Sequence, residues 1–385
     1  MSAFYVFMHL SAMDIEICHL TSVHRPDDIR IFLKECRSLS SQGYKVHLVY
    51  LAEEPFQGEV DGVQLTGIKR TSKSRFGRVL VDGNQLVKHV LKLKPALVHM
   101  HDPELLRFVP QLKQTGIRVI FDAHEDLPLQ VMGKHYIPKL IRKPVSELVS
   151  ALESHYIFKL DALVAATPSI QDKFEKQGVH TVCVRNFPLS DELVSADSMP
   201  AGKRVHEICY IGGIMRSRGI VTLLDAIELL PVRLHLCGSY SPAGLRDELV
   251  QHPAWGKVIE HGFINREGIR SVLDTCRIGM VTLHPQVNYI ESLPIKLFEY
   301  MSAGIPVIAS DFPLWRTIIG DASCGVCTNP TDAFAVAGAI RTLLEDDELC
   351  SRMGSNGRRA VQAEYNWNQE AQQLIGLYEE VLNKT

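Results

Sequence analysis

The sequence lacks most features that would assign it to a specialised class of protein. Its 41 Lys and Arg residues nearly balance 44 Asp and Glu residues, so no basic excess points to nucleic acid as a partner. It has no repeat, no low-complexity segment and no apolar run long enough to cross a membrane. The apolar start, residues 1–12, is too short for that and has no basic beginning. What remains is the composition of a globular protein, and a length of 385 residues favours two domains.

The cysteine residues do not indicate a disulfide framework either. The nine Cys residues are scattered singly through apolar segments, which is typical of buried thiols in a reducing, cytoplasmic compartment. Only Cys324 and Cys327 have the spacing of metal ligands, and no second pair completes a zinc site. Met13 directly precedes the first convincing strand, so residues 1–12 are either an extension or a misassigned start.

The chain alternates strands with helices in both halves. Strand patterns at 14–20 and 45–51 flank a helix predicted over 29–41, which is the signature of a parallel sheet. Further strands are predicted at 60–68, 96–100, 119–121, 162–166, 182–185, 207–211, 233–237, 258–260, 278–283 and 305–309. Further helices are predicted at 85–93, 137–158, 170–177, 220–230, 332–344, 347–363 and 367–382. We expect an N-terminal domain over 1–188, a linker over 189–205, a C-terminal domain over 206–365 and a final helix within 366–385.

Residues 291–310 are the most informative stretch. Ser292 can cap a helix and Pro294 suits its first turn, while Gly304 would end that helix before the apolar strand 305–309. Two carboxylates and a cation accompany this pattern, and they are Glu291, Lys296 and Glu299.

The spacing of these charges suggests a ligand. Lys296 lies three residues before Glu299 and shares a helix face with it. A helix start with free N–H groups beside a lysine attracts a phosphate, and a carboxylate further along can accept hydrogen bonds from a sugar diol. An ordinary surface helix with a Lys296–Glu299 ion pair is the alternative.

Glycines follow three predicted strands of the second half. Gly212 and Gly213 allow a ligand to approach the backbone closely, and Arg218 could clamp a diphosphate. The pattern is not Gly-x-Gly-x-x-Gly, which disfavours a dinucleotide-binding oxidoreductase. Gly238 and the pair Gly262-Phe263 end the next two strands.

Polar residues follow strands of the first half. His101 and Asp102 follow strand 96–100, and His124 and Glu125 follow strand 119–121. Because open α/β sheets bind ligands beyond the carboxyl ends of their strands, these side chains should point at one crevice. The loop after the first strand carries His24, Arg25 and Asp27.

The stretch from Glu291 to Ser310, with its Glu-x7-Glu spacing and Tyr-Met-Ser-Ala-Gly-Ile-Pro-Val-Ile-Ala-Ser ending, resembles the retaining glycosyltransferases of family 4. The resemblance covers residues 14–382 and is strongest over 207–310. It implies an α/β protein of the GT-B fold, with two Rossmann-like α/β/α domains facing a central cleft. It also implies that the C-terminal helix crosses back to the first domain.

In that family the second domain binds a nucleotide-diphosphate sugar and the first binds the acceptor. Gly213 stands where the family usually has an Arg and Arg218 where it has a Lys, so Lys296 is the expected replacement for the missing cation. The implied donor-binding set is Gly212, Gly213, Arg218, Gly238, Gly262, Phe263, Glu291, Ser292, Leu293, Lys296 and Glu299. The implied catalytic residues are His124, Glu291, Arg218 and Lys296, and the acceptor-side residues are His24, Asp27, His101, Asp102 and Glu125.

The expected reaction is transfer of a hexose-type sugar from a UDP- or GDP-sugar, with retention, to a saccharide or lipid-linked saccharide in polysaccharide or glycoconjugate synthesis. No Asp-x-Asp triplet is present, so we expect no metal and no cofactor, and protein cations would stabilise the leaving diphosphate. A GT-B nucleotide-sugar epimerase, a nicotinamide-dependent oxidoreductase and a non-catalytic GT-B binding partner stay open as alternatives.

Two basic segments lie in the first half. Residues 69–78 contain five cations and no acid, and a second cluster begins at Lys134. Both suit weak, peripheral contact with an anionic membrane at the inner face, and a solvated loop and helix is the alternative. The second cluster consists of Lys134, His135, Lys139, Arg142 and Lys143, interleaved with Tyr136, Ile137, Leu140 and Ile141.

Overall fold

The computed structural model describes residues 15–72, 74, 77–133, 137–189, 192–193 and 199–384. The chain forms two compact units, one made of residues 1–185 and 370–385 and the other of residues 186–369. We call them unit 1 and unit 2. The expected N-terminal extension, residues 1–12, lies outside the described part, as do several positions of the predicted linker.

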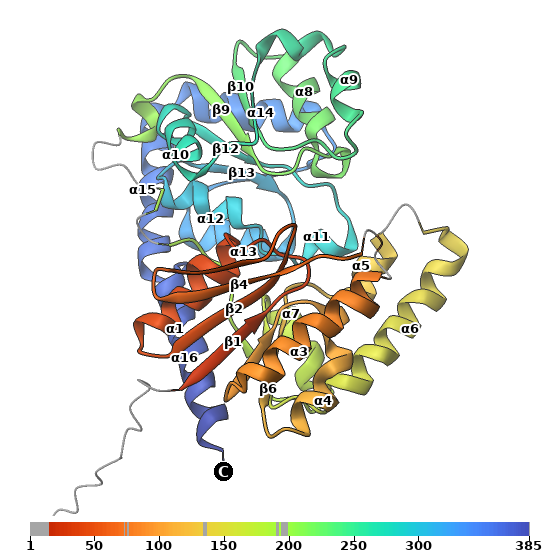
Figure 1. Ribbon diagram of the computed structural model, residues 1–385. Coiled ribbons are helices and arrows are strands. Elements are labelled where there is room, and N and C mark those ends of the chain that lie inside the picture. Colours follow the sequence, from red (N-terminus) through yellow and green to blue (C-terminus); the bar gives the residue numbers. More distant parts are fainter. Residues whose placement is uncertain are drawn as a thin grey trace, which may run out of the picture. The chain divides into compact units, whose positions relative to one another are not determined.

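Unit 1 is built on an eight-stranded sheet of order β3-β4-β2-β1-β5-β6-β7-β8, in which only the β3–β4 pair is antiparallel (Figure 1). The central strands are buried along most of their length because helices cover both faces of a parallel sheet. The strands are β1 (Glu16–Leu20), β2 (Lys45–Ala52), β3 (Phe56–Val60), β4 (Val63–Lys69), β5 (Leu97–Met100), β6 (Arg118–Ala123), β7 (Ala162–Ala165) and β8 (Thr181–Cys183).

The helices of unit 1 begin with a π-helix, η2 (Ile29–Cys36), which Asp28 caps through the N–H groups of Arg30 and Ile31. A π-helical segment is rare and frequently marks a functional site. The other helical segments are α1 (Arg37–Ser41), η3 (Arg78–Asp82), α3 (Gly83–Leu93), η4 (Pro103–Phe108), α4 (Val109–Lys113), α5 (Leu127–Gly133), α6 (Lys139–Ile157) and α7 (Pro168–Glu175).

The prediction of one strand over residues 60–68 is wrong. The chain turns back at Asp61-Gly62, where both residues have positive φ, 51° and 76°. Two central residues with positive φ form the tight turn that matches the twist of an antiparallel pair. Val60 therefore ends β3 and Val63 begins β4, opposite it in register.

Unit 2 is a six-stranded, all-parallel sheet of order β11-β10-β9-β12-β13-β14. Its strands are β9 (Glu207–Ile211), β10 (Arg233–Cys237), β11 (Val258–Gly262), β12 (Ile278–Val281), β13 (Val307–Ser310) and β14 (Gly325–Thr328). Its helical segments are η5 (Ala201–Lys203), η6 (Arg216–Arg218), α8 (Ile220–Glu228), α9 (Leu245–Leu249), η7 (Pro253–Lys257), α10 (Arg266–Thr275), α11 (Val287–Ile290), α12 (Ile295–Ser302), α13 (Pro313–Ala322), α14 (Ala333–Glu345) and α15 (Asp347–Ala363).

The expected capping role of Ser292 is also wrong. Helix α12 begins at Ile295 with Pro294 as its N-cap, and no side chain caps it. Ser292 instead donates its hydroxyl to the carbonyl of Tyr289, 2.9 Å away, because the chain is still leaving the short helix α11 at that point.

The last helix, α16 (Trp367–Asn383), begins in unit 2 and belongs to unit 1 from residue 370 onward. Glu370 accepts hydrogen bonds from the backbone and guanidinium of Arg185, and Tyr378 is buried against His19 and His99. The expected return of the C-terminal helix to the first domain is therefore confirmed. Within the described ranges, no helix is both long and apolar enough to cross a membrane.

The backbones of Gly238, after β10, and Gly212, after β9, lie in close contact, and this contact can be tested. A Cβ built on Gly238 (φ +144°) would lie 1.9 Å from the carbonyl oxygen of Gly212, so Gly238→Ala forces the backbone to shift. We expect a loss of about 1–3 kcal/mol, measured as a lower melting temperature. Gly256→Ala is the control, because no atom lies within 4 Å of its built Cβ. Equal melting temperatures for the two variants would contradict the close contact between Gly238 and the Gly212 carbonyl.

Candidate functional site

Three glycines lie side by side where strands of unit 2 end. The N–H of Gly238, after β10, donates to the carbonyl of Gly262 at the end of β11, 2.7 Å away. The N–H of Gly212, after β9, donates to the carbonyl of Cys237 at 2.9 Å. Gly212 and Gly262 both have positive φ, which only glycine adopts without strain. These glycines form a side-chain-free floor at the carboxyl ends of the strands, where open sheets bind ligands.

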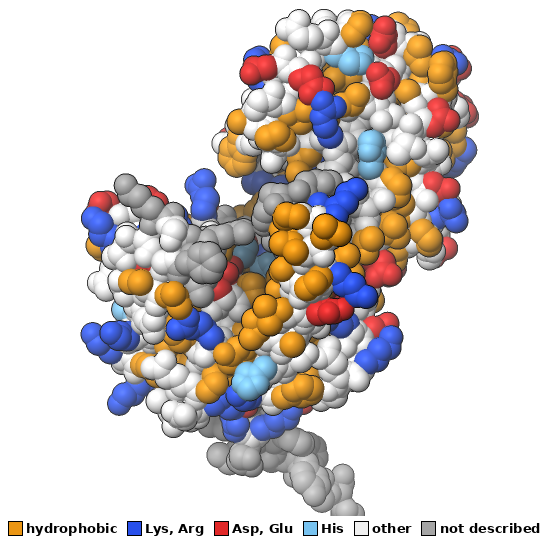
Figure 2. All heavy atoms as spheres, turned by 90° about the vertical axis from the view of Figure 1, so that its right-hand side faces the viewer, with side chains coloured by type: hydrophobic (Ala, Val, Ile, Leu, Met, Phe, Trp, Pro, Cys, Tyr) orange, Lys and Arg blue, Asp and Glu red, His pale blue; other side chains and the backbone are white. Residues whose placement is uncertain are grey.

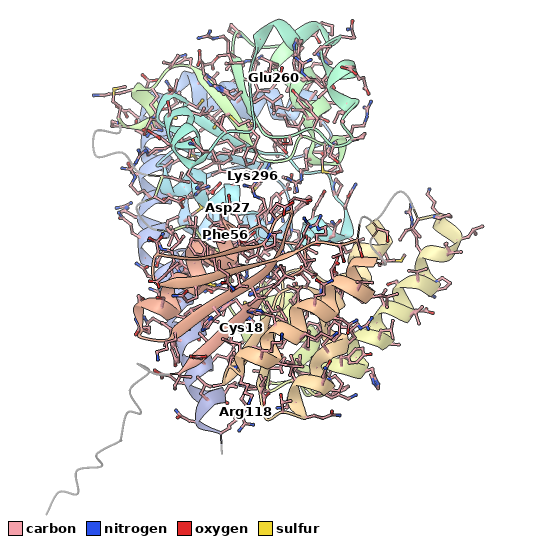
Figure 3. The ribbon with its side chains drawn as sticks, in the orientation of Figure 1. Cys18, Asp27, Phe56, Arg118, Glu260 and Lys296 are labelled. Atoms are coloured by element: carbon pink, nitrogen blue, oxygen red, sulfur yellow. The ribbon has the colours of Figure 1, made fainter. Side chains whose placement is uncertain are left out.

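Lys296 reaches this floor from the first turn of α12 (Figure 3). Its side chain is buried, its ammonium lies 3.7 Å from the ring centre of Tyr210, and its Nζ has no hydrogen-bond partner among the described residues. Burial lowers the pKa of Lys296 well below its ordinary value, and the charge of Arg218 lowers it further. Buried polar groups are nearly always paired. The buried, unpaired Nζ of Lys296 is therefore a place where an anion could bind.

Arg218 points at the same place from the short helix η6. A Cβ built on Gly212 would lie 3.7 Å from both Arg218 Nη1 and Lys296 Nζ, so the two cations converge on this glycine. Arg218 Nε is buried and has no hydrogen-bond partner within the described chain. The structure thus brings Gly212, Gly213, Arg218 and Lys296 together, as the sequence predicted.

Glu299 lies one turn after Lys296 on the buried side of α12. Its Oε1 accepts a hydrogen bond from Arg266 Nη1 at 2.6 Å, and Arg266 also binds Glu192 through two nitrogens at 2.6 and 2.8 Å. The alternative interpretation, an ordinary Lys296–Glu299 ion pair, does not describe this carboxylate, because Arg266 holds it. Sequence reasoning missed Arg266 and Glu192, because they lie 33 and 107 positions from Glu299 (299 − 266 and 299 − 192) and share no motif with it.

The remaining predicted donor residues surround this group in unit 2. Glu291 is exposed at the end of α11, and Leu293 packs against the hydrophobic core. The carbonyl of Ser292 accepts a hydrogen bond from the indole of Trp315 at 2.7 Å, which anchors the turn before α12. Phe263 is 81% exposed beside Gly262, so its ring is available for stacking.

In unit 1, Asp102 organises the loop after β1. It accepts hydrogen bonds from the Thr21 hydroxyl (2.7 Å) and the Ser22 N–H (2.6 Å), and His24 Nδ1 lies 3.3 Å from its other oxygen. Burial alone would raise the pKa of Asp102, but the hydrogen bond and charge of His24, with these donors, lower it to about 2. Asp102 therefore positions the loop and His24.

His124 is three-quarters buried and pairs with a carboxylate that the sequence reasoning did not select. Its Nε2 lies 2.9 Å from Asp122 Oδ2, and Asp122 also binds the guanidinium of Arg30 through both oxygens. The rings of His24 and His124 have centres 5.3 Å apart, and those of His101 and His124 5.7 Å apart. The three predicted histidines are thus close together at the ends of β1, β5 and β6.

His101 differs from the other two because its side chain is fully buried. It lies among His19, His99 and Glu35, a cluster beneath the strand ends that the sequence reasoning missed. Asp27 and Glu125 lie at the surface, and Asp27 pairs with Arg25 at 2.9 Å. The described contacts do not bring either of these acids to the histidines.

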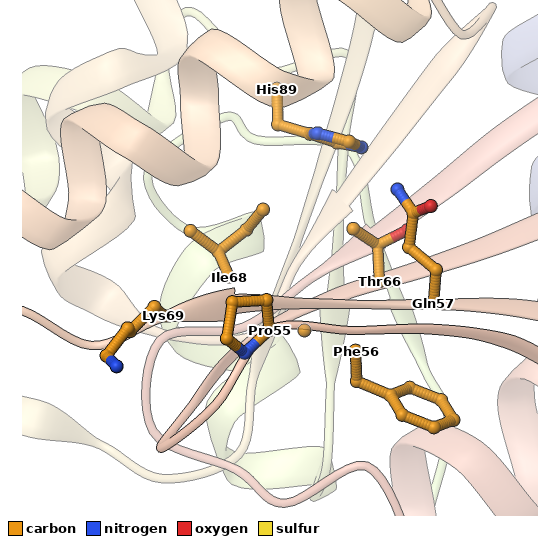
Figure 4. Close-up of a pocket in the computed structure, with 8 residues that line it drawn as sticks. Pro55, Phe56, Gln57, Thr66, Ile68, Lys69 and His89 are labelled. Carbon is orange, nitrogen blue, oxygen red and sulfur yellow. The ribbon is translucent and has the colours of Figure 1, made fainter.

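A hollow of about 470 Å³ lies over the β3–β4 hairpin and α3 (Figure 4). None of the residues predicted to bind donor or acceptor lines it, so we assign it no role in the reaction. Its lining residues are Pro55, Phe56, Gln57, Thr66, Gly67, Ile68, Lys69 and His89.

Comparison with known proteins agrees with the geometry. The family model described as "Glycosyltransferase Family 4" matches residues 30–186, and the model described as "Glycosyl transferases group 1" matches residues 198–360. The chain belongs to family 4 of the glycosyltransferases. As a member of this family, the protein is a sugar-transferring enzyme, which confirms the expected class.

Individual relatives extend over nearly the whole chain. The phosphatidyl-myo-inositol mannosyltransferase of Mycobacterium leprae is 24% identical over 365 residues, 93% of this chain and 89% of that protein. A structure of sucrose-phosphate synthase from Thermosynechococcus elongatus has a TM-score of 0.80 at 19% identity and covers 96% of this chain and 100% of that one. Anabaena HepE in complex with UDP-glucose has a TM-score of 0.71 at 14% identity and covers 95% and 100%. These matches confirm the GT-B fold of this family 4 member.

The His24–Asp102 pair makes a titration prediction. Burial lowers the pKa of His24, but the hydrogen bond and charge of Asp102 outweigh it and raise the pKa above 6.5. Because the folded pKa is raised, the pair's stabilisation is complete below pH 6.5 and is lost as pH rises through the folded pKa. NMR titration of the His24 ring should show a midpoint above 6.5 that falls in Asp102→Asn. Asp27→Asn, which removes an acid that pairs with Arg25, should leave the midpoint unchanged; an equal shift in both variants would contradict the pairing.

Proposed function

We propose that unit 2 binds a nucleotide-diphosphate sugar and that the enzyme transfers the sugar, with retention, to a saccharide or lipid-linked saccharide bound by unit 1. The observation that carries this proposal is the convergence of Lys296 and Arg218 on the glycine floor, where Lys296 Nζ and Arg218 Nε have no hydrogen-bond partner among the described residues. Similar proteins support it, since the HepE structure contains UDP-glucose and the Mycobacterium leprae relative is a phosphatidyl-myo-inositol mannosyltransferase.

The diphosphate would lie over Gly212 and Gly213, against the cations. Its negative charge would supply a partner for Lys296 and raise the pKa of the amine again. As the bond to the sugar breaks, negative charge grows on the leaving phosphate, and preorganised cations stabilise it without reorganising. This arrangement needs no metal, which supports the metal-independent mechanism that we propose.

Glu299 would bind the ribose of the donor. Arg266 fixes the orientation of the carboxylate through Oε1, and a carboxylate has about four lone-pair sites, so hydroxyl donors can be added to this bond. Phe263, exposed beside Gly262, would stack on the nucleobase. Glu291 would lie nearer the sugar and influence which sugar is accepted.

On the acceptor side, His124 would contact the reacting hydroxyl. Asp122 holds one ring nitrogen at 2.9 Å, which orients the imidazole and leaves the other nitrogen for a ligand. In this family the leaving phosphate is thought to take the acceptor proton, so His124 would orient the acceptor rather than act as the base.

If the donor site is as proposed, substitutions in it should affect turnover and nucleotide binding separately. Lys296→Met and Arg218→Met should each lower kcat on the order of 10²-fold, because each removes charge from the leaving group. Glu299→Gln should weaken nucleotide binding about ten- to a hundredfold, since hydrogen bonds to a charged group contribute roughly 1.5–3 kcal/mol. Calorimetry with UDP and GDP measures binding, and release of the nucleotide measures turnover.

The controls for these variants lie nearby. Glu267→Gln removes an exposed carboxylate next to Arg266, and Arg341→Met removes an exposed cation on α14. Both should behave like the parent. Parental turnover in Lys296→Met and Arg218→Met, or parental affinity in Glu299→Gln, would place the donor site elsewhere.

Product analysis distinguishes the competing reactions. NMR of the product should show the anomeric configuration of the donor and a new glycosidic bond. Turnover of the nucleotide sugar without an acceptor would instead identify an epimerase. A change in nicotinamide absorbance would identify an oxidoreductase, and tight binding without any turnover a non-catalytic partner.

We also propose that unit 1 contacts an anionic membrane weakly through helix α6. Leu140, Ile141, Leu148 and Leu152 are between 49% and 93% exposed, and Figure 2 shows hydrophobic side chains gathered along this face with cations beside them. Ile141, Leu148 and Leu152 have the spacing of one helix stripe. Apolar side chains flanked by Lys and Arg suit the boundary between headgroups and acyl chains.

Part of the earlier basic set lies outside the described residues, namely Lys73, Arg75 and Lys134 to Tyr136. Arg142 is also engaged, since its guanidinium donates to the carbonyls of Ile137 and Met132. The proposal therefore rests on the exposed apolar stripe together with Lys139 and Lys143.

Vesicle sedimentation at low salt tests this contact. The parent should pellet with vesicles containing anionic lipid and release as salt rises, because each cation near the surface contributes about 1 kcal/mol. Leu140→Gln combined with Leu148→Gln and Lys139→Gln should abolish pelleting. Phe334→Gln, at a position 78% exposed on α14, serves as the control. Equal pelleting by the triple variant and the parent would end the proposal.

A further inference from the structure

The buried face of the central strands of unit 1 carries an unusual concentration of imidazoles. His19 on β1 and His99 on β5 are register partners, and His101 follows two residues later on the same strand face. Glu35 of the π-helix η2 covers them, and its side chain, like those of the three histidines, is fully buried. A nonpolar core would be the ordinary occupant of this position, so the four polar side chains need an explanation.

The hydrogen bonds within the described residues satisfy only part of this group. His19 Nδ1 and His101 Nε2 lie 2.9 Å apart, and His99 Nδ1 lies 2.9 Å from the Tyr378 hydroxyl, which a bound metal would displace. Both carboxylate oxygens of Glu35, His99 Nε2 and His101 Nδ1 are buried without a hydrogen-bond partner of acceptable geometry. The nearest cation, Arg30, lies 3.1 Å from Glu35 but directs its hydrogen bonds to Asp122 and to the carbonyl of Val184. Buried polar atoms left in this state are rare, and a bound ion is one explanation for them.

The four side chains have the spacing of metal ligands. Glu35 Oε2 lies 3.8 Å from His19 Nδ1, 3.9 Å from His99 Nδ1 and 3.8 Å from His101 Nε2, and the nitrogens of His19 and His101 are 2.9 Å apart. A tetrahedral zinc ion with bonds of about 2.0–2.1 Å separates its ligand atoms by about 3.3–3.4 Å. All four candidate ligand atoms lie within 4.8 Å of one another, so the group would have to contract to close around an ion.

The surroundings also resemble those of a metal site. His101 directs its other nitrogen toward Asp122 at 3.5 Å, and His19 directs its other nitrogen toward the Tyr378 hydroxyl at 3.1 Å. Metal-bound histidines usually have such an oxygen partner behind them, which orients the ring and raises its basicity.

A second possible group, His101 with Asp122 and His124, is less suitable. Asp122 already binds Arg30 through both oxygens, so a metal would have to compete with that bidentate pair. Glu35 lies 3.1 Å from Arg30 and beside Asp122, but no hydrogen bond of good geometry within the described residues holds its carboxylate oxygens.

We propose that His19, Glu35, His99 and His101 bind a zinc ion that has a structural role in unit 1. Three imidazoles and one carboxylate match the ligand types of zinc, and four protein ligands in a fully buried place leave no open position for substrate water. The ion would join β1, β5 and η2, and through Tyr378 it would fix the position of α16. Metal-independent sugar transfer is unaffected, because this ion would not touch the diphosphate.

Metal analysis of the full-length protein tests the proposal. Protein purified without chelators and desalted should retain about one zinc ion per chain by mass spectrometry. His99→Gln should lower that content at least tenfold. His235→Gln is the matched control, because His235 is also buried and bonded to a second histidine and to Glu207, and it should retain the zinc.

Measurements on the unmodified chain cover the case in which His99→Gln does not fold. A strong chelator should lower the melting temperature, added zinc should restore it, and replacement by cobalt should give the visible absorption of a tetrahedral site. A protein that contains and takes up no zinc, with a melting temperature insensitive to chelator, would overturn the proposal in favour of a hydrogen-bonded cluster. Equal zinc content in the parent and a folded His99→Gln would overturn it as well.

Discussion

The buried ammonium of Lys296 is the constraint on which the candidate donor site depends. It lies against the face of Tyr210 in the interior of unit 2, close to the guanidinium of Arg218. Holding two cations this close while desolvating one of them disfavours the charged form, unless an anion compensates. The glycines after β9, β10 and β11 leave space for that anion, because no side chain rises from the strand ends. The diphosphate that we propose as the ligand would supply that anion.

The two units position their polar groups in different ways. In unit 2, glycines without side chains leave room beside two cations, as at Gly212 and Gly238. In unit 1, buried carboxylates hold histidines in fixed orientations, as Asp102 does for His24 and Asp122 does for His124. The first arrangement suits a charged, flexible diphosphate, and the second suits selection among neutral hydroxyl groups.

Much of this could be predicted from local patterns. The convergence of Arg218 and Lys296 followed from a motif, and the parallel sheets followed from buried apolar runs. The β3 strand was missed because it lies at a sheet edge with mostly exposed residues, so no apolar alternation marks it. Helices α10 and α13 were missed although Asn265 caps the first and Pro313 begins the second. The contacts of Glu299 with Arg266, and of Glu35 with three histidines, depend on tertiary folding and leave no local signal.

The most direct test of the central claim is proton uptake by Lys296 when a nucleoside diphosphate binds. If burial and Arg218 lower the pKa of Lys296 in the free protein, the incoming anion must raise it again. Calorimetry of UDP or GDP binding at a series of pH values below 10.5, in buffers of different ionisation enthalpy, should show net proton uptake within that range that disappears in Lys296→Met. Binding with no proton uptake, or with the same uptake in the variant, would contradict the account.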